Sequence, residues 1–416
     1  MSFKKTVIST VAAAVVATSA FAAVTVNQDG KGEYLNFPAY YATTDGWSTN
    51  LRVVNTNTTH AVVAKVVIRE FATSQELLDF PIYLSPGDVW TADIVNNGST
   101  SSVKITSTDD SGPIPGSGMD QALFDKGPKG PGAGNNIAYG YVEVLTLGKM
   151  AAADIAATDA AVTWSEFTPL PKATIKAAFE NTANAWLPTE GEVFGQQTIT
   201  ATTAGAERSM TLMATALDVT MPGAMGWEAN PAGTFATDTT ADAMWYPGVE
   251  AEIRDALKKD AVQVVNYVAA EGETQLLLTQ PYKHTNVDAN STGTGNVAPY
   301  FDNATTSNGY SLGKFYYTAR AWDEQENTYV DPESVYSGGV TVTAAKACET
   351  EVCYLKTSDA GDYASGWTNY TLGTSADTRT FIGGVPTITT VITGIRVNGV
   401  GIVNMIPAAN TPTVAP

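Results

Sequence analysis

The sequence predicts a mainly β protein made of antiparallel β-sandwich domains with a helical insertion. Short segments of alternating apolar and polar residues, turn signals between them, and Ala-rich runs confined to the middle of the chain all favour this class. A chain of 416 residues that is 44% apolar can build more than one core. We therefore expect a signal peptide at 1–22, an N-terminal β-sandwich at 23–147, a mixed helical insertion at 148–265 and a C-terminal β-rich domain at 266–416.

Residues 1–22 have the pattern of a secretory signal peptide. Lys4 and Lys5 form a positive start, Val7–Val16 is a short apolar stretch, and Ala20-Phe21-Ala22 fits the small-x-small cleavage rule. Cleavage there removes two lysines and no acidic residue, which changes the formal charge from −19 to −21. The expected location is the cell surface or the extracellular space, with the periplasm as an alternative.

The segment 23–147 is dominated by strand patterns. Leu78, Phe80, Ile82 and Leu84 alternate with polar or aromatic residues, which predicts one buried face, and the turn Ser85-Pro86-Gly87-Asp88 follows. Further strands are expected at 51–55, 62–71, 89–95 and 137–145, the third of these with Trp90 on its buried side. Strands at this spacing are typical of an Ig-like sandwich. Residues 107–136 are rich in Gly, Pro, Ser and Asp and predict a long surface loop.

Helical character is confined to the middle of the chain. Ala-rich runs cover 150–161, 172–187 and 249–262, and Ile175, Ala178 and Phe179 form an apolar stripe in the second run. Strand patterns return at 275–279, 315–322 and 387–403, where Asn398-Gly399 is a two-residue hairpin signal.

Charge and composition exclude several classes of function. A net charge of −19 argues against nucleic acid as a partner, because a phosphate backbone requires clustered Lys and Arg. Two cysteines and two histidines leave little material for a zinc site or for histidine catalysis. No segment is long and apolar enough to predict a transmembrane helix.

Cys348 and Cys353 bracket four residues in a chain that is expected to be exported. An oxidising compartment favours a structural disulfide between them. A redox pair is the alternative, but such pairs prefer a Cys-x-x-Cys spacing, and the two intervening glutamates would raise the thiol pKa values.

Several stretches resemble a family of secreted or cell-surface proteins of Gram-negative bacteria that has no known activity. They are Tyr34–Tyr41, Leu51–Thr56, Gly140–Leu145 and, most distinctively, Glu76–Thr91. The resemblance covers mainly the first 145 residues and carries no catalytic motif. It implies secretion and a surface location.

Calcium is the one metal that the sequence suggests. Asp288, Asn290 and Thr292 begin like an EF-hand loop, although Pro299 stands where the bidentate Glu is required. The same three residues fit the extended acceptor pattern of bacterial N-glycosylation, with Asn290 as the acceptor. A plain solvated turn is the alternative.

A serine hydrolase is the remotest hypothesis. Gly309-Tyr310-Ser311-Leu312-Gly313 matches the nucleophile-elbow pattern, but polar residues precede it and a strand pattern follows it. Both His60 and His284 precede Ser311, whereas the α/β-hydrolase order requires a histidine after the serine.

The leading hypothesis is therefore an exported, non-enzymatic surface or structural protein that acts through assembly or adhesion. Its expected partners are itself and other surface proteins, with glycans as a further candidate. The alternative is a β-sandwich module that binds carbohydrate or another small ligand, in which Trp47, Trp90, Trp245 or Trp367 would stack on a sugar. No cofactor is required by either hypothesis, and calcium is the candidate ion.

Overall fold

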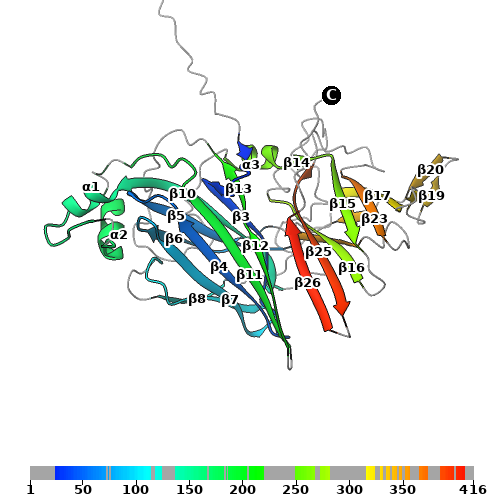
Figure 1. Ribbon diagram of the computed structural model, residues 1–416, viewed down its shortest axis with the longest axis horizontal. Coiled ribbons are helices and arrows are strands. Elements are labelled where there is room, and N and C mark those ends of the chain that lie inside the picture. The colour runs from blue at the N-terminus through cyan, green and yellow to red at the C-terminus, as the bar shows by residue number, and fades with distance from the viewer. Residues whose placement is uncertain are drawn as a thin grey trace, which may run out of the picture.

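The chain folds into several antiparallel sheets with few helices, as Figure 1 shows. This computed structural model describes residues 24–71, 74, 76–113, 118–123, 136–165, 168–181, 184, 186–203, 206–219, 249–267, 272–281, 315–323, 328–330, 334–337, 340–343, 346–348, 352–356, 365–372, 385–397 and 400–407. The prediction of a mainly β protein is confirmed. The signal peptide predicted at 1–22 lies outside the described residues.

Sheet I has six strands in the order β1-β13-β3-β10-β5-β6. Their bounds are Thr25–Val26 (β1), Thr215–Asp218 (β13), Tyr34–Tyr41 (β3), Tyr139–Ala151 (β10), His60–Glu70 (β5) and Glu76–Leu84 (β6). Sheet II has the path β12-β11-β4-β7-β8-β9, with β2 paired to β11. Its strands are Ala206–Met213 (β12), Val193–Thr203 (β11), Trp47–Asn55 (β4), Val89–Ser99 (β7), Ser102–Ser107 (β8), Met119–Ala122 (β9) and Lys31–Gly32 (β2).

Sheets I and II share one hydrophobic core. Phe37, Val66 and Phe80 enter it from sheet I, while Trp90 and Ile94 enter it from sheet II. Trp90 is fully buried and lies 5.9 Å from the Phe80 ring, as its alternation with core residues predicts. The outer face of sheet II is more open, so its strands keep the alternating pattern that the sequence shows.

Sheet I differs from the prediction because both of its faces are buried. On β6 the expected core residues face sheet II, but Asp79 and Tyr83 on the opposite face are also almost fully buried. Helix α1 (Ala152–Ala157) and helix α2 (Lys172–Glu180) cover one part of this outer face, and Phe179 of α2 packs there beside Trp186. The Ser85–Asp88 turn forms as predicted, and Lys172 binds its Ser85 and Asp88 side chains.

The segment predicted as a mixed helical insertion contributes strands as well as helices. Residues 193–218 form β11, β12 and β13, which complete sheets I and II. The first two helices end at 157 and 180, and the third, α3, spans Val249–Ala256. Thr-rich stretches such as 198–203 favour strands, because β-branched side chains pack well on a pleated surface. The boundaries predicted at 147/148 and 265/266 fall inside β10 and β15.

Two further sheets make up the C-terminal part. Sheet III has the order β22-β16-β25-β26, with bounds Val352–Lys356 (β22), Gly272–Thr279 (β16), Ile388–Val397 (β25) and Val400–Pro407 (β26). Sheet IV has the path β15-β23-β17-β18, with β21 also paired to β17. Its strands are Ala261–Tyr267 (β15), Ser365–Leu372 (β23), Phe315–Asp323 (β17), Thr328–Val330 (β18) and Lys346–Cys348 (β21). Two short pairs are Lys258–Lys259 (β14) with Val385–Pro386 (β24), and Ser334–Ser337 (β19) with Val340–Thr343 (β20).

The four sheets are stacked in the order II, I, III, IV. Leu276 and Leu278 of β16 enter a core shared with sheet IV, while Leu277 packs on Ala39 and Tyr141 of sheet I. The Thr279 hydroxyl donates a hydrogen bond to the Pro38 carbonyl, which ties sheet III to β3. Sheet III is thus covered on both sides, and this is why β16 contains an uninterrupted run of leucines.

Charged side chains on the outer face of sheet I are buried as ion pairs. Lys65 Nζ lies 2.5 Å from Asp79, and Arg69 Nε lies 2.5 Å from Glu143, which also accepts a 2.6 Å hydrogen bond from the Tyr34 hydroxyl. Burial without a partner costs a charge several kcal/mol, so each pair must form together with the layers that cover it.

None of the described helices is long and apolar enough to span a membrane.

We predict that Lys65→Met lowers the free energy of unfolding by about 3–5 kcal/mol, because it leaves the buried Asp79 carboxylate without its cation. Lys104→Met is the matched control: it removes a lysine from an exposed pair with Asp120 and should cost about 1 kcal/mol or less. Adding Asp79→Leu to Lys65→Met should recover part of the loss. Chemical denaturation measures all three variants, and equal effects of the two lysine substitutions would contradict burial of the Lys65 pair.

Candidate functional site

The outer face of sheet IV carries the most exposed aromatic surface on a described strand face. The inward residues Ala319, Ala321 and Tyr370 belong to the core shared with sheet III. Because side chains alternate along a strand, the residues between them point away from that core. The register places Trp322 opposite Trp367 and Arg320 opposite Asn369, and it places Gln263 beside Asn369 on β15. We call these five residues the tryptophan face.

Trp322 and Trp367 form a parallel stack. Their ring centroids are 4.1 Å apart and their planes differ by 11°, and Trp367 remains 38% exposed. The separation of the ring centroids is close to the spacing of neighbouring strands. The two rings are therefore stacked along the line that leads from β17 to β23. Each ring covers one face of the other. The other face of Trp367 is consequently directed toward β15, where the register places Val265 opposite Trp367 and the exposed Gln263 two residues along the strand.

Polar groups surround the stacked rings. Arg320 and Gln263 are exposed, and Asn369 is half-buried and donates a 3.2 Å hydrogen bond to the Thr371 hydroxyl. Among the described strand positions that face outward on sheet IV, Arg320 holds the only charged side chain. The face therefore combines a rigid apolar surface with amide and guanidinium donors, which is the composition of a ligand-binding surface.

Gly366 permits the close strand approach that aligns the two rings. A Cβ at this position would lie 1.9 Å from the Trp322 carbonyl oxygen and 2.9 Å from the Asp323 Cα. Both contacts are with backbone atoms, which cannot rotate away. Glycine is required here for strands β17 and β23 to keep the register that pairs Trp322 with Trp367.

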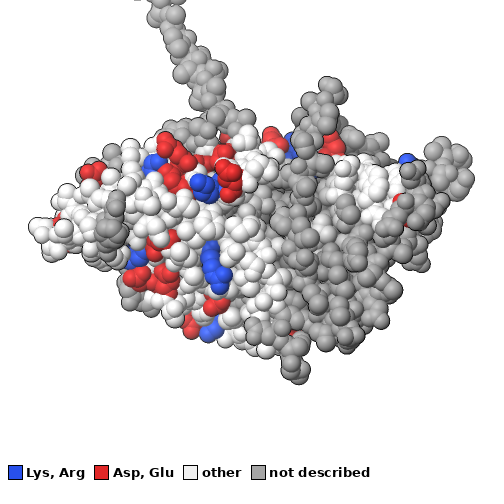
Figure 2. Space-filling view, in the orientation of Figure 1, with Lys and Arg blue, Asp and Glu red and all other residues white. Residues whose placement is uncertain are grey.

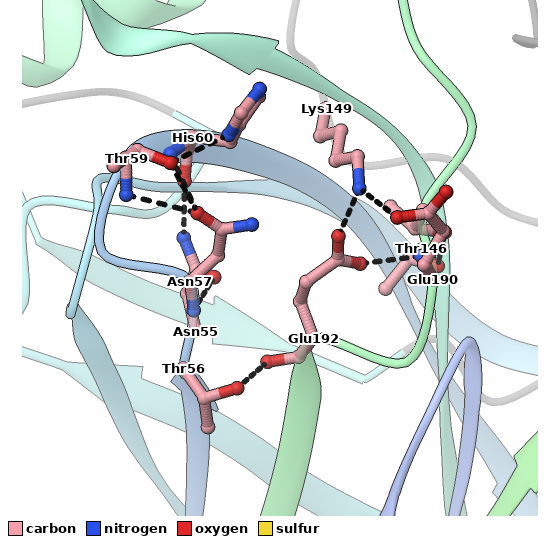
Figure 3. Close-up of polar contacts among 10 residues, drawn as sticks. Asn55, Thr56, Asn57, Thr59, His60, Thr146, Lys149, Glu190 and Glu192 are labelled. Carbon is pink, nitrogen blue, oxygen red and sulfur yellow. Dashed lines mark hydrogen bonds and ion pairs between the residues drawn. The ribbon is translucent and has the colours of Figure 1, made fainter.

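Several charged side chains elsewhere in the described part of the chain form ion pairs with one another. Figure 2 shows acidic side chains in clusters, with basic side chains beside several of them. One such cluster surrounds Lys149, whose ammonium binds Glu192 and lies 3.0 Å from Glu190 (Figure 3). Burial alone would lower the pKa of Lys149, but the hydrogen bonds to Glu192 and Glu190 outweigh it and raise this pKa. The lysine supplies the countercharge, so the cluster is a structural tie between β10 and the 187–192 connection.

The neighbourhood of His60 is a turn held by its own side chains. The Asn57 side-chain oxygen accepts hydrogen bonds from the backbone N–H groups of Thr59 and His60, at 2.9 and 2.8 Å. The His60 ring contacts the Thr59 hydroxyl at 2.9 Å, as Figure 3 shows. These are the contacts of an Asx turn between β4 and β5, where the sequence predicts a turn.

Burial shifts the pKa of two further groups. It lowers the pKa of Lys259 to about 8. It also raises the pKa of Glu33, which is opposed by the 2.8 Å hydrogen bond from the Val219 N–H and assisted by the Asp218 charge. Structural networks also produce such shifts, and neither group lies in sheet IV.

Most of the residues singled out from the sequence for metal binding, glycosylation or hydrolysis lie outside the described residues. These are Asp288, Asn290, Thr292, His284 and Ser311. Within the described part of the chain, no group of three or more His, Cys, Asp and Glu side chains is arranged to hold a metal ion. Cys353 is buried in β22, and the side chain of Cys348 lies outside what is described, so their pairing stays a prediction.

Sequence reasoning found one of the five residues of the tryptophan face. Trp367 is one of four tryptophans proposed to stack on sugar, of which Trp90 is buried, Trp47 packs against Tyr41, and Trp245 lies outside the described residues. Trp322 and Arg320 were missed as site residues. Their spacing of two within a predicted strand was a signal that both share a face, but only the register with β23 places them beside Trp367.

Comparison with known proteins adds no family or relative. No family model, curated protein or solved structure matches this chain.

We predict that Gly366→Ala separates the stacked tryptophans, because the added Cβ forces β23 away from the Trp322 carbonyl. Circular dichroism should show loss of the exciton signal of the coupled indoles, identified as the signal that Trp322→Phe also removes. Gly112→Ala is the control, since a Cβ there meets no atom within 4 Å. An unchanged exciton signal in Gly366→Ala would contradict the register between β17 and β23.

Proposed function

We propose that this protein is an exported, non-enzymatic adhesion protein that binds carbohydrate through the tryptophan face. The observation that carries the proposal is the exposed Trp367 ring, held by its stack on Trp322 with Arg320, Asn369 and Gln263 around it. Scarcity of histidine and the acidic, low-lysine composition support a binding role over an enzymatic one.

The chemistry of a sugar ring complements this surface. A pyranose presents apolar C–H groups on its faces and hydroxyl groups around its edge. The C–H groups would pack on the open face of Trp367, where burial of an aromatic surface supplies most of the binding energy. The side-chain amides of Asn369 and Gln263 carry both donors and acceptors, so each can donate a hydrogen bond to a sugar hydroxyl group or accept one from it.

The shape of the site favours a polymer over a small free sugar. The tryptophan face is one side of a sheet, and ligands on an open face bury less surface than ligands in a pocket. Each contact is then weak, and useful affinity comes from many copies of the protein that bind one polymer or one cell surface. Many weak contacts with one surface are the mode of binding that adhesion proteins use.

The proposal also contains three structural expectations from the sequence. Sheets I and II would form an Ig-like sandwich, for which their shared core and antiparallel strands give support. Residues 1–22 would direct export, in keeping with the resemblance to secreted surface proteins. Cys348 and Cys353 would form a disulfide in that compartment. Mass spectrometry of the secreted, unreduced protein tests the last two, with a mature N-terminus at Ala23 and no free thiol as the expected results.

We predict that Trp367→Ala weakens carbohydrate binding at least tenfold, because loss of a central aromatic anchor typically costs about 2 kcal/mol or more. A glycan array of the purified wild-type protein selects the ligand, and calorimetry measures each variant. Trp47→Ala is the control: it removes a partly exposed tryptophan of sheet II that packs on Tyr41, and it should leave binding unchanged. Absence of any glycan ligand for the wild-type protein, or equal binding by wild type and Trp367→Ala, would reject the proposal.

A further inference from the structure

We infer that the tryptophan face selects acidic saccharides, and that Arg320 binds the carboxylate of a uronic acid residue. This inference rests on the proposed carbohydrate binding and names the class of sugar. It starts from Arg320, an exposed arginine that has no countercharge among the described residues.

Arg320 differs from the basic residues of this acidic chain that lie in surface ion pairs. Lys104, Lys176, Arg254 and Lys258 each lie within 3.2 Å of a carboxylate oxygen, although all four are at or near the surface. Arg320 is exposed and forms no ion pair or hydrogen bond with the described residues, and its outward neighbours in the register are uncharged. In a chain with 42 acidic and 23 basic residues, an exposed basic group with no partner among the described residues can bind an external anion.

The position of Arg320 suits a ligand that also contacts the tryptophans. It lies two residues from Trp322 on the same face of β17 and directly opposite Asn369, which is two residues from Trp367 on β23. Residues two apart along a strand are separated by about 6.6 Å. That step is comparable with the length of one sugar residue. One pyranose can therefore lie on Trp367 while the carboxylate of the next one reaches Arg320.

The geometry of the guanidinium group makes Arg320 specific for a carboxylate. The planar fork of Arg320 can donate two parallel hydrogen bonds to a carboxylate, and this geometry is not available with a neutral ester or a hydroxymethyl group. Because Arg320 is exposed, the gain is modest and is reduced by salt. The inference is thus a preference among sugars, superimposed on the stacking that Trp367 supplies to all of them.

The experiment compares two forms of one sugar. Calorimetry measures binding of an oligogalacturonate and of the same oligomer with every carboxylate converted to its methyl ester. We expect the wild-type protein to bind the acid roughly fivefold more tightly than the ester, which is the upper range for an exposed ion pair. In Arg320→Gln the two affinities should become equal, and the affinity for the ester should stay at its wild-type value. Arg320→Lys keeps the charge without the fork and should retain only part of the preference.

Arg52→Gln is the matched control, because Arg52 is an exposed arginine on sheet II whose side chain contacts Gln196 at 3.2 Å. It should keep the full preference for the acid. Equal binding of acid and ester by the wild type, or an undiminished preference in Arg320→Gln, overturns the inference and leaves the proposed function intact. Loss of both ligands in Trp367→Ala, with binding present in the wild type, supports the proposed function separately. Polyglutamate is the last arm: if it binds as tightly as the oligogalacturonate, the site recognises acidic peptides and the inference fails.

Discussion

Burial of sheet I on both faces is the constraint on which the rest of the structure depends. Sheet II covers one face, while sheet III and the helices α1, α2 and α3 cover the other. Lys65 and Arg69 lie on that second face, so their ion pairs with Asp79 and Glu143 are stable only when these layers are in place. The C-terminal sheets are accordingly part of the stability of the N-terminal ones, although the two regions are far apart in sequence.

The same stacking order limits where a ligand can bind. Sheets I and III are interior, so among the described residues of these four sheets the open surfaces are the outer faces of sheets II and IV. On sheet II the polar side chains satisfy one another across strands: Asn50 binds Asp93 at 2.8 Å, Arg52 binds Gln196, and Thr198 lies 3.1 Å from Thr211. On sheet IV, Trp367 is exposed and Arg320 has no described partner. An unsatisfied surface has more to gain from a ligand, which is why the tryptophan face is the better candidate.

Local patterns in the sequence predicted most of the strands but not the way in which the sheets are layered. The alternation of Leu78, Phe80, Ile82 and Leu84 gave β6 and its core face, because a period of two follows from strand geometry alone. Burial of the intervening Asp79 and Tyr83 depends on contacts with Lys65 and α2. These partners are distant in sequence, so no local pattern around Asp79 and Tyr83 predicts the contacts. The strands at 193–218 were missed because an Ala- and Thr-rich segment matches either a helix or a strand until a sheet edge is present to pair with it.

In the candidate site, too, local sequence predicts the residue types but not the contacts between distant residues. The residue types were visible in the sequence, and Trp367 was singled out for its chemistry. The pairing of Trp322 with Trp367 depends on the register of β17 and β23, which Gly366 sets through a backbone contact that no sequence pattern encodes. The net charge of −19 pointed toward cations, whereas the one charged group at an outward position of the described part of sheet IV is an arginine.

Net charge and local charge act over different distances, and this reconciles an acidic protein with an acidic ligand. At physiological ionic strength, interactions between exposed charges are largely screened beyond about 8 Å. The repulsion from distant carboxylates therefore slows the approach of a polyanion, but it contributes little once the polymer touches sheet IV. At the described outward positions of that sheet the only charge is that of Arg320, and its outward neighbours on β23 and β18 are uncharged. The recognition that we propose for this face would consequently be decided by contact, with the stacked tryptophans supplying the apolar surface and the arginine supplying the positive charge.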